Sequence, residues 1–240
     1  PFPGSAESSR NGGNQIGKIM QFRVDNTRGW DGDVTTGTKL RAQKVFRLDG
    51  LEPDRVRTHS LVELFRADGG VLMATLDNRT FHNHDYRDWK LPGNEPVRQD
   101  SLEVWEFANT TMDSHPIHLH LVQFQVLNRQ PFDAAGYLAA NYPVDPGTGR
   151  LEVNTGPYPA PSPRDFLTGA PQPPAPNEMG WKDTVQAPPG MVTRIVVPFG
   201  SGAVKGEEIA ATSVYSGEYV WHCHILEHED NDMMQRYVIE

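Results

Sequence analysis

Short apolar runs separated by turn residues are the feature that most limits the fold of this chain. They begin near residue 45 and have the lengths and the alternation of β-strands. No stretch keeps the 3.6-residue period of an amphipathic helix for long. The runs that we expect to form strands are 55–65, 71–76, 102–107, 117–127, 191–199, 218–225 and 234–239. This pattern predicts an all-β fold, most simply a Greek-key sandwich.

Two parts of the sequence lack this strand pattern. Residues 1–45 are rich in Gly, Asn and Ser, and we interpret them as a connector that ends in a strand of a preceding domain. Eleven of the 20 prolines fall between Arg129 and Trp181. A loop of this length in a compact domain is usually functional or disordered. We therefore expect a domain over 46–240 with a long proline-rich loop insertion, 131–180, which is either a lid that shapes a substrate site or a solvent loop.

Charge and cysteine content exclude several kinds of partner. Lys and Arg total 22 against 31 Asp and Glu, a formal net charge of -9, which argues against nucleic acid or an anionic membrane surface. No apolar run approaches the roughly 20 residues that cross a bilayer. The single cysteine, Cys223, cannot form an internal disulfide, so cysteine usage leaves the cellular compartment open.

Five histidines and the only cysteine are concentrated in two short segments. These segments read His115-Pro116-Ile117-His118-Leu119-His120 and His222-Cys223-His224. Because successive side chains of a strand point to opposite faces, Cys223 faces one side while both flanking histidines face the other. The first segment has matching parity. We therefore expect one strand pair to build two metal sites back to back, with Cys223 and His115 on one side and His118, His120, His222 and His224 on the other.

The cysteine side has the ligand types of a blue, or type 1, copper. His228 follows Cys223 across a short turn and supplies a second imidazole beside His115. Met233 or Met234 offers a thioether. Two imidazoles and a thiolate in a trigonal plane, with a long axial Met, define a type 1 electron-transfer copper.

The opposite side carries four imidazoles. Because neither site contains a carboxylate, Mg²⁺ and Ca²⁺ are excluded. Zinc can bind histidine alone, but it does not explain why Cys223 lies between two ligands of another site. Electron transfer does explain it, since Cys223 can pass an electron along its own backbone to His222 and His224.

The two motifs resemble those of the last cupredoxin domain of multicopper oxidases. The first reads His-Pro-Ile-His-Leu-His, and the second reads Trp-His-Cys-His-Ile-Leu-Glu-His-Glu-Asp and is followed by Asp-Met-Met. The resemblance runs from about Ile19 to the C-terminus, includes Gly-Trp-Lys-Asp-Thr at 180–184, and is strongest to bacterial spore-coat laccases, bilirubin oxidases and phenoxazinone synthase-like o-aminophenol oxidases. It implies a cupredoxin sandwich, with 1–45 as the tail of a preceding cupredoxin domain. It assigns type 1 copper to His115, Cys223, His228 and axial Met233, type 2 copper to His118, and type 3 copper to His120, His222 and His224.

The same resemblance implies an activity. It points to a laccase-like oxidase that takes single electrons from phenols or aminophenols at type 1 copper and reduces O2 to water at a trinuclear copper cluster. Cys223 carries the electrons in this interpretation, and Glu229 matches a carboxylate that helps to deliver protons. An extracellular, periplasmic or spore-associated location is favoured, with a cytoplasmic one still open.

Histidine counting implies a partner for this chain. The trinuclear cluster of the family needs eight histidines, and the two motifs supply four of them. A symmetric assembly of identical chains cannot supply the others. We therefore expect an N-terminal cupredoxin segment of the same oxidase, present as a separate chain.

Other functions remain as alternatives. A single-copper electron-transfer cupredoxin uses only the type 1 ligands and leaves four histidines without a role. A copper nitrite reductase carries histidine on only one side of its cysteine. A cuprous-ion oxidase is disfavoured because the seven Met form no Met-rich segment.

Several further residues have interpretations of their own. His82 and His84 form a His-x-His pair in a polar turn, and we do not assign them as ligands. We interpret His59 as a strand-surface histidine, and Trp105 and Trp181 as core residues.

Overall fold

The structure is a computed structural model that describes residues 37–38, 44–81, 95–204 and 214–240. The chain divides into two compact units, Pro1–Lys44 and Val45–Glu240. Almost all of the first unit, together with His82 and His84, lies outside the described residues. The description below therefore concerns the second unit.

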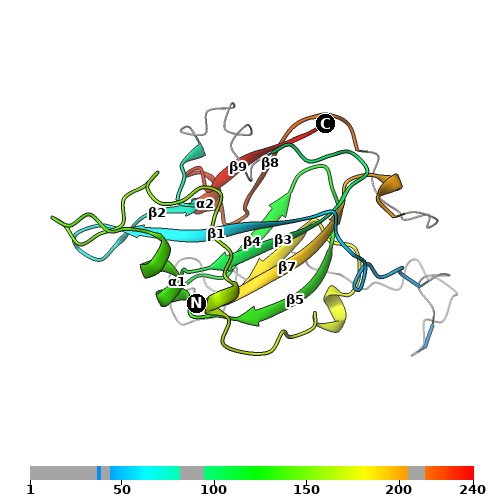
Figure 1. Cartoon of the computed structure of the whole chain (residues 1–240), viewed down its shortest axis with the longest axis horizontal. Coiled ribbons are helices and arrows are strands. Elements are labelled where there is room, and N and C mark those ends of the chain that lie inside the picture. Colours follow the sequence, from blue (N-terminus) through cyan, green and yellow to red (C-terminus); the bar gives the residue numbers. More distant parts are fainter. Residues whose placement is uncertain (1–36, 39–43, 82–94, 205–213) are drawn as a thin grey trace, which may run out of the picture. The chain divides into compact units, whose positions relative to one another are not determined.

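The second unit is built from two β-sheets (Figure 1). The five-stranded sheet has the order β2-β1-β3-β7-β5, and the four-stranded sheet has the order β6-β4-β8-β9. Strands β1 and β3 pair in parallel, and the other pairs are antiparallel. The strands are β1 (Arg55–Phe65), β2 (Val71–Leu76), β3 (Leu102–Asn109), β4 (His115–Leu119), β5 (Gln125–Pro131), β6 (Thr184–Ala187), β7 (Met191–Pro198), β8 (Gly217–Cys223) and β9 (Met234–Ile239).

The core lies between the two sheets. Trp105 and Ile195 come from the five-stranded sheet, while Ile117 and Trp221 come from the four-stranded sheet, and all four belong to one buried cluster. Each sheet therefore buries one face against the other, as in a β-sandwich. The predicted all-β sandwich is confirmed.

The strands of the structure differ from the predicted ones at two places. The predicted run 117–127 is two strands, because Leu121 has a left-handed backbone (φ 67°) and the chain passes there from the four-stranded to the five-stranded sheet. Strand β6 was not predicted, since four residues directly after a proline-rich segment give too short a pattern.

The proline-rich insertion contains ordered structure. Between β5 and β6 the chain forms α1 (Ala134–Asn141) and the short 3₁₀ helices η3 (Arg164–Phe166) and η4 (Pro176–Glu178). The side chain of Asp133 accepts a hydrogen bond from the Gly136 amide and caps α1. Tyr137 of this helix packs with Val62 and Val192 of the five-stranded sheet in a second buried cluster. The remaining short helices are η5 (Ser201–Ala203) and α2 (Leu226–Glu229).

Candidate metal centres

The strand pair β4–β8 positions both groups of candidate ligands. Its register places Ile117 opposite Cys223 and His118 opposite His222. Because neighbouring residues of a strand alternate in direction, Cys223 faces the core while His222 faces the other side of the sheet. His115 and Cys223 are both completely buried. This register therefore places the two predicted sites on opposite faces of the sheet.

The cysteine group unites three elements. The Sγ of Cys223 at the end of β8 lies 3.5 Å from Nδ1 of His115 on β4 and 3.7 Å from Nδ1 of His228 on α2. The potential ligand atoms of these three residues all lie within 4.8 Å of one another. This spacing allows one ion to contact all three.

Met233 lies on the same face as Cys223. The Cys223 amide donates to the Met233 carbonyl at 3.0 Å, and Met234 pairs with His222. Alternation therefore places Met233 toward the core, where it is completely buried, and Met234 toward the opposite face. Between the two methionines, this geometry favours Met233 as the thioether beside the cysteine.

Hydrogen bonds outside the cysteine group orient its histidines. Nε2 of His115 lies 2.6 Å from the hydroxyl of Thr111, and donation from Nε2 leaves the Nδ1 lone pair directed at the cysteine sulfur. Burial, followed by the neighbouring His228, lowers the pKa of His115 to about 3. Burial also raises the pKa of the Cys223 thiol to about 12. His115 is thus held as the neutral imidazole that a metal requires.

The opposite face brings three histidines together. Potential ligand atoms of His118, His120 and His222 lie within 4.8 Å of one another, and Nε2 of His120 is 3.2 Å from Nε2 of His222. Nδ1 of His118 lies 2.9 Å from the Asp183 carbonyl oxygen, and Nδ1 of His222 lies 3.0 Å from the Cys223 carbonyl oxygen. With the Nδ1–H groups donated to these carbonyls, the lone pairs of His118 and His222 are on Nε2, and that of His222 is next to Nε2 of His120.

His224 and Glu229 lie at the edge of this group. The ring centroid of His224 is 5.2 Å from that of His222, and about half of the His224 side chain is exposed. Oε2 of Glu229 lies 3.3 Å from Nδ1 of His224 and 3.6 Å from Nδ1 of His222. This oxygen is buried and has no hydrogen-bond partner. It is therefore an available acceptor next to two of the predicted ligands.

The donor atoms fit copper. Thiolate and imidazole are the ligands that copper accepts most readily, and a His₂Cys group with a thioether nearby is typical of type 1 copper. On the opposite face, potential ligand atoms of three histidines lie within 4.8 Å of one another, and two Nε2 atoms are 3.2 Å apart. Lone pairs on such atoms repel one another unless a cation or a proton lies between them, so this arrangement also fits metal binding.

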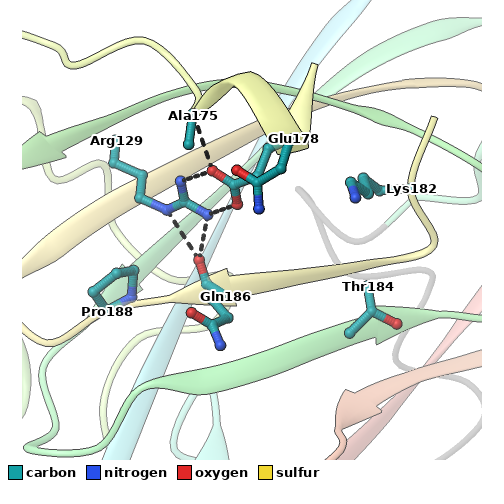
Figure 2. A pocket seen from close by; sticks show the side chains of 8 residues that line it. Arg129, Ala175, Glu178, Lys182, Thr184, Gln186 and Pro188 are labelled. Atoms are coloured by element: carbon teal, nitrogen blue, oxygen red, sulfur yellow. Dashed lines mark hydrogen bonds and ion pairs between the residues drawn. The ribbon is translucent and has the colours of Figure 1, made fainter. Parts of the chain in front are cut away.

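A pocket of about 480 Å³ lies beside the outer histidine face and opens between β6 and η4. Figure 2 shows Arg129 holding the carboxylate of Glu178 and the backbone oxygen of Gln186 on one side of it. Thr184 lines the pocket and also lies 3.1 Å from Nδ1 of His118. The pocket thus reaches a residue that contacts a predicted ligand.

Comparison with known proteins decides the family. The family model described as "Multicopper oxidase" matches residues 69–240. The chain belongs to the multicopper oxidase family. Copper is therefore the metal implied for these sites, and the group around Cys223 fits its type 1 form.

Relatives of this multicopper oxidase chain include two curated laccases. The laccase of Bacillus subtilis (strain 168) is 43% identical over 217 residues, which cover 90% of this chain and 33% of the relative. The laccase of Bacillus stratosphericus is 38% identical over 224 residues, covering 90% and 34% respectively. A solved structure, the McoA multicopper oxidase of Aquifex aeolicus, matches with 22% identity and a TM-score of 0.45, and covers 82% of this chain and 32% of that chain. This chain spans about a third of the length of these relatives.

The predicted family and metal are confirmed, whereas the interpretation of His59 was wrong. Its side chain is largely buried, its Nδ1 lies 2.9 Å from Oδ2 of Asp77, and its ring packs 4.5 Å from that of Trp221. The strand pattern alone could not reveal this, because the face of β1 that carries His59 is covered by the second sheet. Trp105 is in the core, as predicted, and Trp181 is partly buried.

Sequence reasoning missed the residues that orient the ligands. Thr111 and Thr184 contact His115 and His118 respectively. Thr111 lies four residues before His115, and this proximity was the available signal. Thr184 lies 66 residues after His118, so only the β4–β6 pairing brings the two together.

Proposed function

We propose that this chain is the C-terminal, copper-binding part of a laccase-like oxidase. The arrangement that carries the proposal is one strand pair with a His₂Cys group on one face and converging histidines on the other. When copper is bound, it supplies one-electron oxidation of a phenol or aminophenol at the type 1 site and reduction of O2 to water at the trinuclear cluster. In this interpretation residues 46–240 are the C-terminal cupredoxin domain, and 1–45 are a connector and the tail of a preceding cupredoxin domain.

The ligand assignment follows the faces of the strand pair. The imidazoles of His115 and His228 hold type 1 copper with Cys223, since their Nδ1 atoms face its sulfur. The burial and position of Met233 support it as the axial ligand. The proposed trinuclear ligands are His118 for type 2 copper and His120, His222 and His224 for type 3 copper.

Cys223 and Glu229 have the roles that link the two sites. Cys223 is covalently joined to His222 and His224 through single peptide bonds, which gives electrons a short bonded route between the faces. Glu229 places an unpartnered carboxylate oxygen beside His222 and His224. We propose that this carboxylate accepts and releases protons needed when O2 is reduced.

The remaining trinuclear ligands come, in this proposal, from an N-terminal cupredoxin segment of the same oxidase. The outward direction of the histidine face supports such a partner, and so does the exposure of His120 and His224 among the described residues. We retain the prediction that this segment is a separate chain, which native mass spectrometry of the purified enzyme can test. A small aromatic donor and O2 are the other partners.

The location of the protein is part of the proposal as well. Among the described residues, no helix is long and apolar enough to cross a membrane. We favour an extracellular, periplasmic or spore-associated site, and cell fractionation of the source organism can test this.

Copper counting together with an optical spectrum and an oxygen electrode tests the function. Four coppers per complete enzyme, an intense thiolate-to-copper band and O2 consumption with o-aminophenol or a methoxyphenol are the expected results. One copper with the same band and no O2 consumption would instead identify the single-copper electron carrier. Oxidation of bilirubin, tested as a third donor, then distinguishes among the possible substrates.

A further inference from the structure

Four oxidisable rings form a continuous array that starts beside the predicted copper ligands. Trp221 directly precedes His222, and its ring centroid lies 6.0 Å from that of Trp105. Trp105 lies 5.6 Å from Tyr237, and Tyr237 lies 5.8 Å from Tyr219. The first three rings are buried and Tyr219 is partly exposed. The array therefore leads from the ligands through the core toward solvent.

The last three rings each donate a hydrogen bond to an acceptor. The acceptors are the Glu103 carboxylate for Trp105, the His120 carbonyl for Tyr237 and the Tyr215 carbonyl for Tyr219, at 3.0, 2.5 and 3.0 Å. An oxidised indole or phenol is a much stronger acid than the neutral ring. An acceptor already in place therefore makes the loss of an electron from these rings easier.

Glu103 strengthens this effect at the centre of the array. Its side chain is buried and forms a two-point ion pair with Arg57, with N–O distances of 2.6 and 3.0 Å. The carboxylate thus places a negative charge next to the Trp105 indole, where it favours a positively charged ring. Phe107 and Phe199 pack beside the same tryptophans, but they are not oxidisable and lie off the path.

We propose that Trp221, Trp105, Tyr237 and Tyr219 form an electron path that protects the metal centres from oxidants of the hydroxyl-radical class, derived from peroxide. The proposal rests on the proposed oxidase function, because O2 reduction at the histidine face is what makes such oxidants a hazard there. Trp221 gives one electron to the oxidant, and each following ring returns one electron to the ring before it. The electron deficiency thus moves to Tyr219.

The overall reaction balances at the two ends of the path. Tyr219 loses one electron and releases its phenolic proton toward the Tyr215 carbonyl and solvent, which leaves a tyrosyl radical. The hydroxyl radical gains one electron and one proton and becomes water. A phenolic donor at the surface then gives a hydrogen atom to Tyr219, which restores the tyrosine and produces a phenoxyl radical.

Freeze-quench electron paramagnetic resonance on the copper-loaded, full-length enzyme tests the path. The reduced enzyme is mixed with hydrogen peroxide in the absence of a donor, with ring-deuterated tyrosine for assignment. We expect a tyrosyl radical in the wild-type enzyme and its loss in Tyr237→Phe, with oxidative products mapped by mass spectrometry moving to Trp221 and Trp105.

Tyr137→Phe is the matched control. Tyr137 is equally buried and its hydroxyl also donates to a backbone carbonyl, that of Pro161 at 2.8 Å, yet it lies in the other hydrophobic cluster. Both substitutions remove a single hydroxyl, so both variants are expected to fold. A tyrosyl signal that survives in Tyr237→Phe, or that disappears equally in Tyr137→Phe, would overturn the proposal.

A photochemical experiment separates this inference from the proposed function. Azide radicals generated by a light flash oxidise tryptophan in the full-length, copper-free protein. Tryptophanyl absorption is expected to decay while tyrosyl absorption grows, and this growth is expected to be lost in Tyr237→Phe. Such transfer in a protein that does not reduce O2 would refute the oxidase alone. Its absence in an active oxidase would refute the path alone.

Discussion

At the scale of single residues, the contact of one ring nitrogen indicates which other nitrogen of each histidine is available to a metal. Thr111 takes the Nε2–H of His115, and the carbonyls of Asp183 and Cys223 take the Nδ1–H groups of His118 and His222. In the proposed assignment His115 therefore binds through Nδ1, while these two histidines of the opposite face bind through Nε2. Such outer contacts fix both the ring orientation and the basicity of a metal-binding histidine.

Thr111→Val tests this role. We expect copper affinity at the thiolate site to fall about 10–100-fold, because the Nε2–H of His115 loses its buried acceptor. Titration of apoprotein with copper, followed through the thiolate band, measures the change. Thr110→Val is the control, since Thr110 donates to the Leu61 carbonyl instead of to a ligand. Equal affinities of the two variants would argue against the assigned role of Thr111.

Met233 and Met234 provide a second comparison of neighbours. Met233→Leu is expected to raise the reduction potential of the type 1 copper, since loss of a thioether donor destabilises the more highly charged oxidised ion. Met234→Leu is expected to leave that potential unchanged. Redox titration of the thiolate band measures both. A shift of the reduction potential in Met234→Leu alone would instead indicate Met234 as the axial ligand.

Most of the proposed ligands could be predicted from the sequence. Strand alternation assigned six of the eight predicted ligands to faces, and these six lie together as expected, because His-x-His and His-Cys-His are local patterns. The choice between Met233 and Met234 needed the β8–β9 register, which no local pattern gives. The contact between Thr184 and His118 needed long-range pairing, and so did the burial of His59.

At the scale of elements, an ion pair ties the insertion to the sheet. Arg129 on β5 holds Glu178 on η4 through two hydrogen bonds of 2.7 and 2.6 Å. The hydrogen bonds from Arg129 hold the pKa of Glu178 below its ordinary value. A carboxyl with a lowered folded-state pKa stabilises the fold above its unfolded pKa, and the contribution is lost as the pH falls through the folded pKa.

Glu178→Gln should therefore have a pH-dependent effect on stability. We expect a loss of about 1 kcal/mol at neutral pH, and a loss that approaches zero once the pH is below the folded pKa of Glu178. Urea denaturation of both proteins across the acidic range measures the difference. The control is Glu52→Gln, which removes the same charge from an exposed position and should show no such pH dependence. A constant difference at all pH values would contradict the ion-pair explanation.

The elements themselves were predictable to different degrees. Strands β1, β2 and β9 coincide with the predicted runs because they are short apolar or alternating segments next to turn residues. Helix α1 was missed, since it is only eight residues long and lies among prolines. The local cap of Asp133 stabilises it, and so does the burial of Tyr137, which depends on tertiary packing.

At the scale of the whole molecule, this chain is expected to form one metal centre without help. The 240-residue chain should bind one copper tightly and show the thiolate band, because all four proposed type 1 ligands lie within it. It should not consume O2 with a phenolic donor. Addition of the N-terminal cupredoxin segment is expected to raise the copper content to four and to start O2 consumption. Full copper loading and activity of the isolated chain would refute the need for a partner.

The alternation of ligands along β4 and β8 has a consequence for how such an enzyme can change. A slip of one residue between these strands would exchange their faces, so neither centre can be relocated by itself. An insertion in the connection between β5 and β6 leaves the β4–β8 register unchanged, whereas one between His115 and His120 or between His222 and Cys223 would shift it. The two centres are therefore gained, kept or lost together, and new donors can be accommodated only by remodelling the surrounding loops.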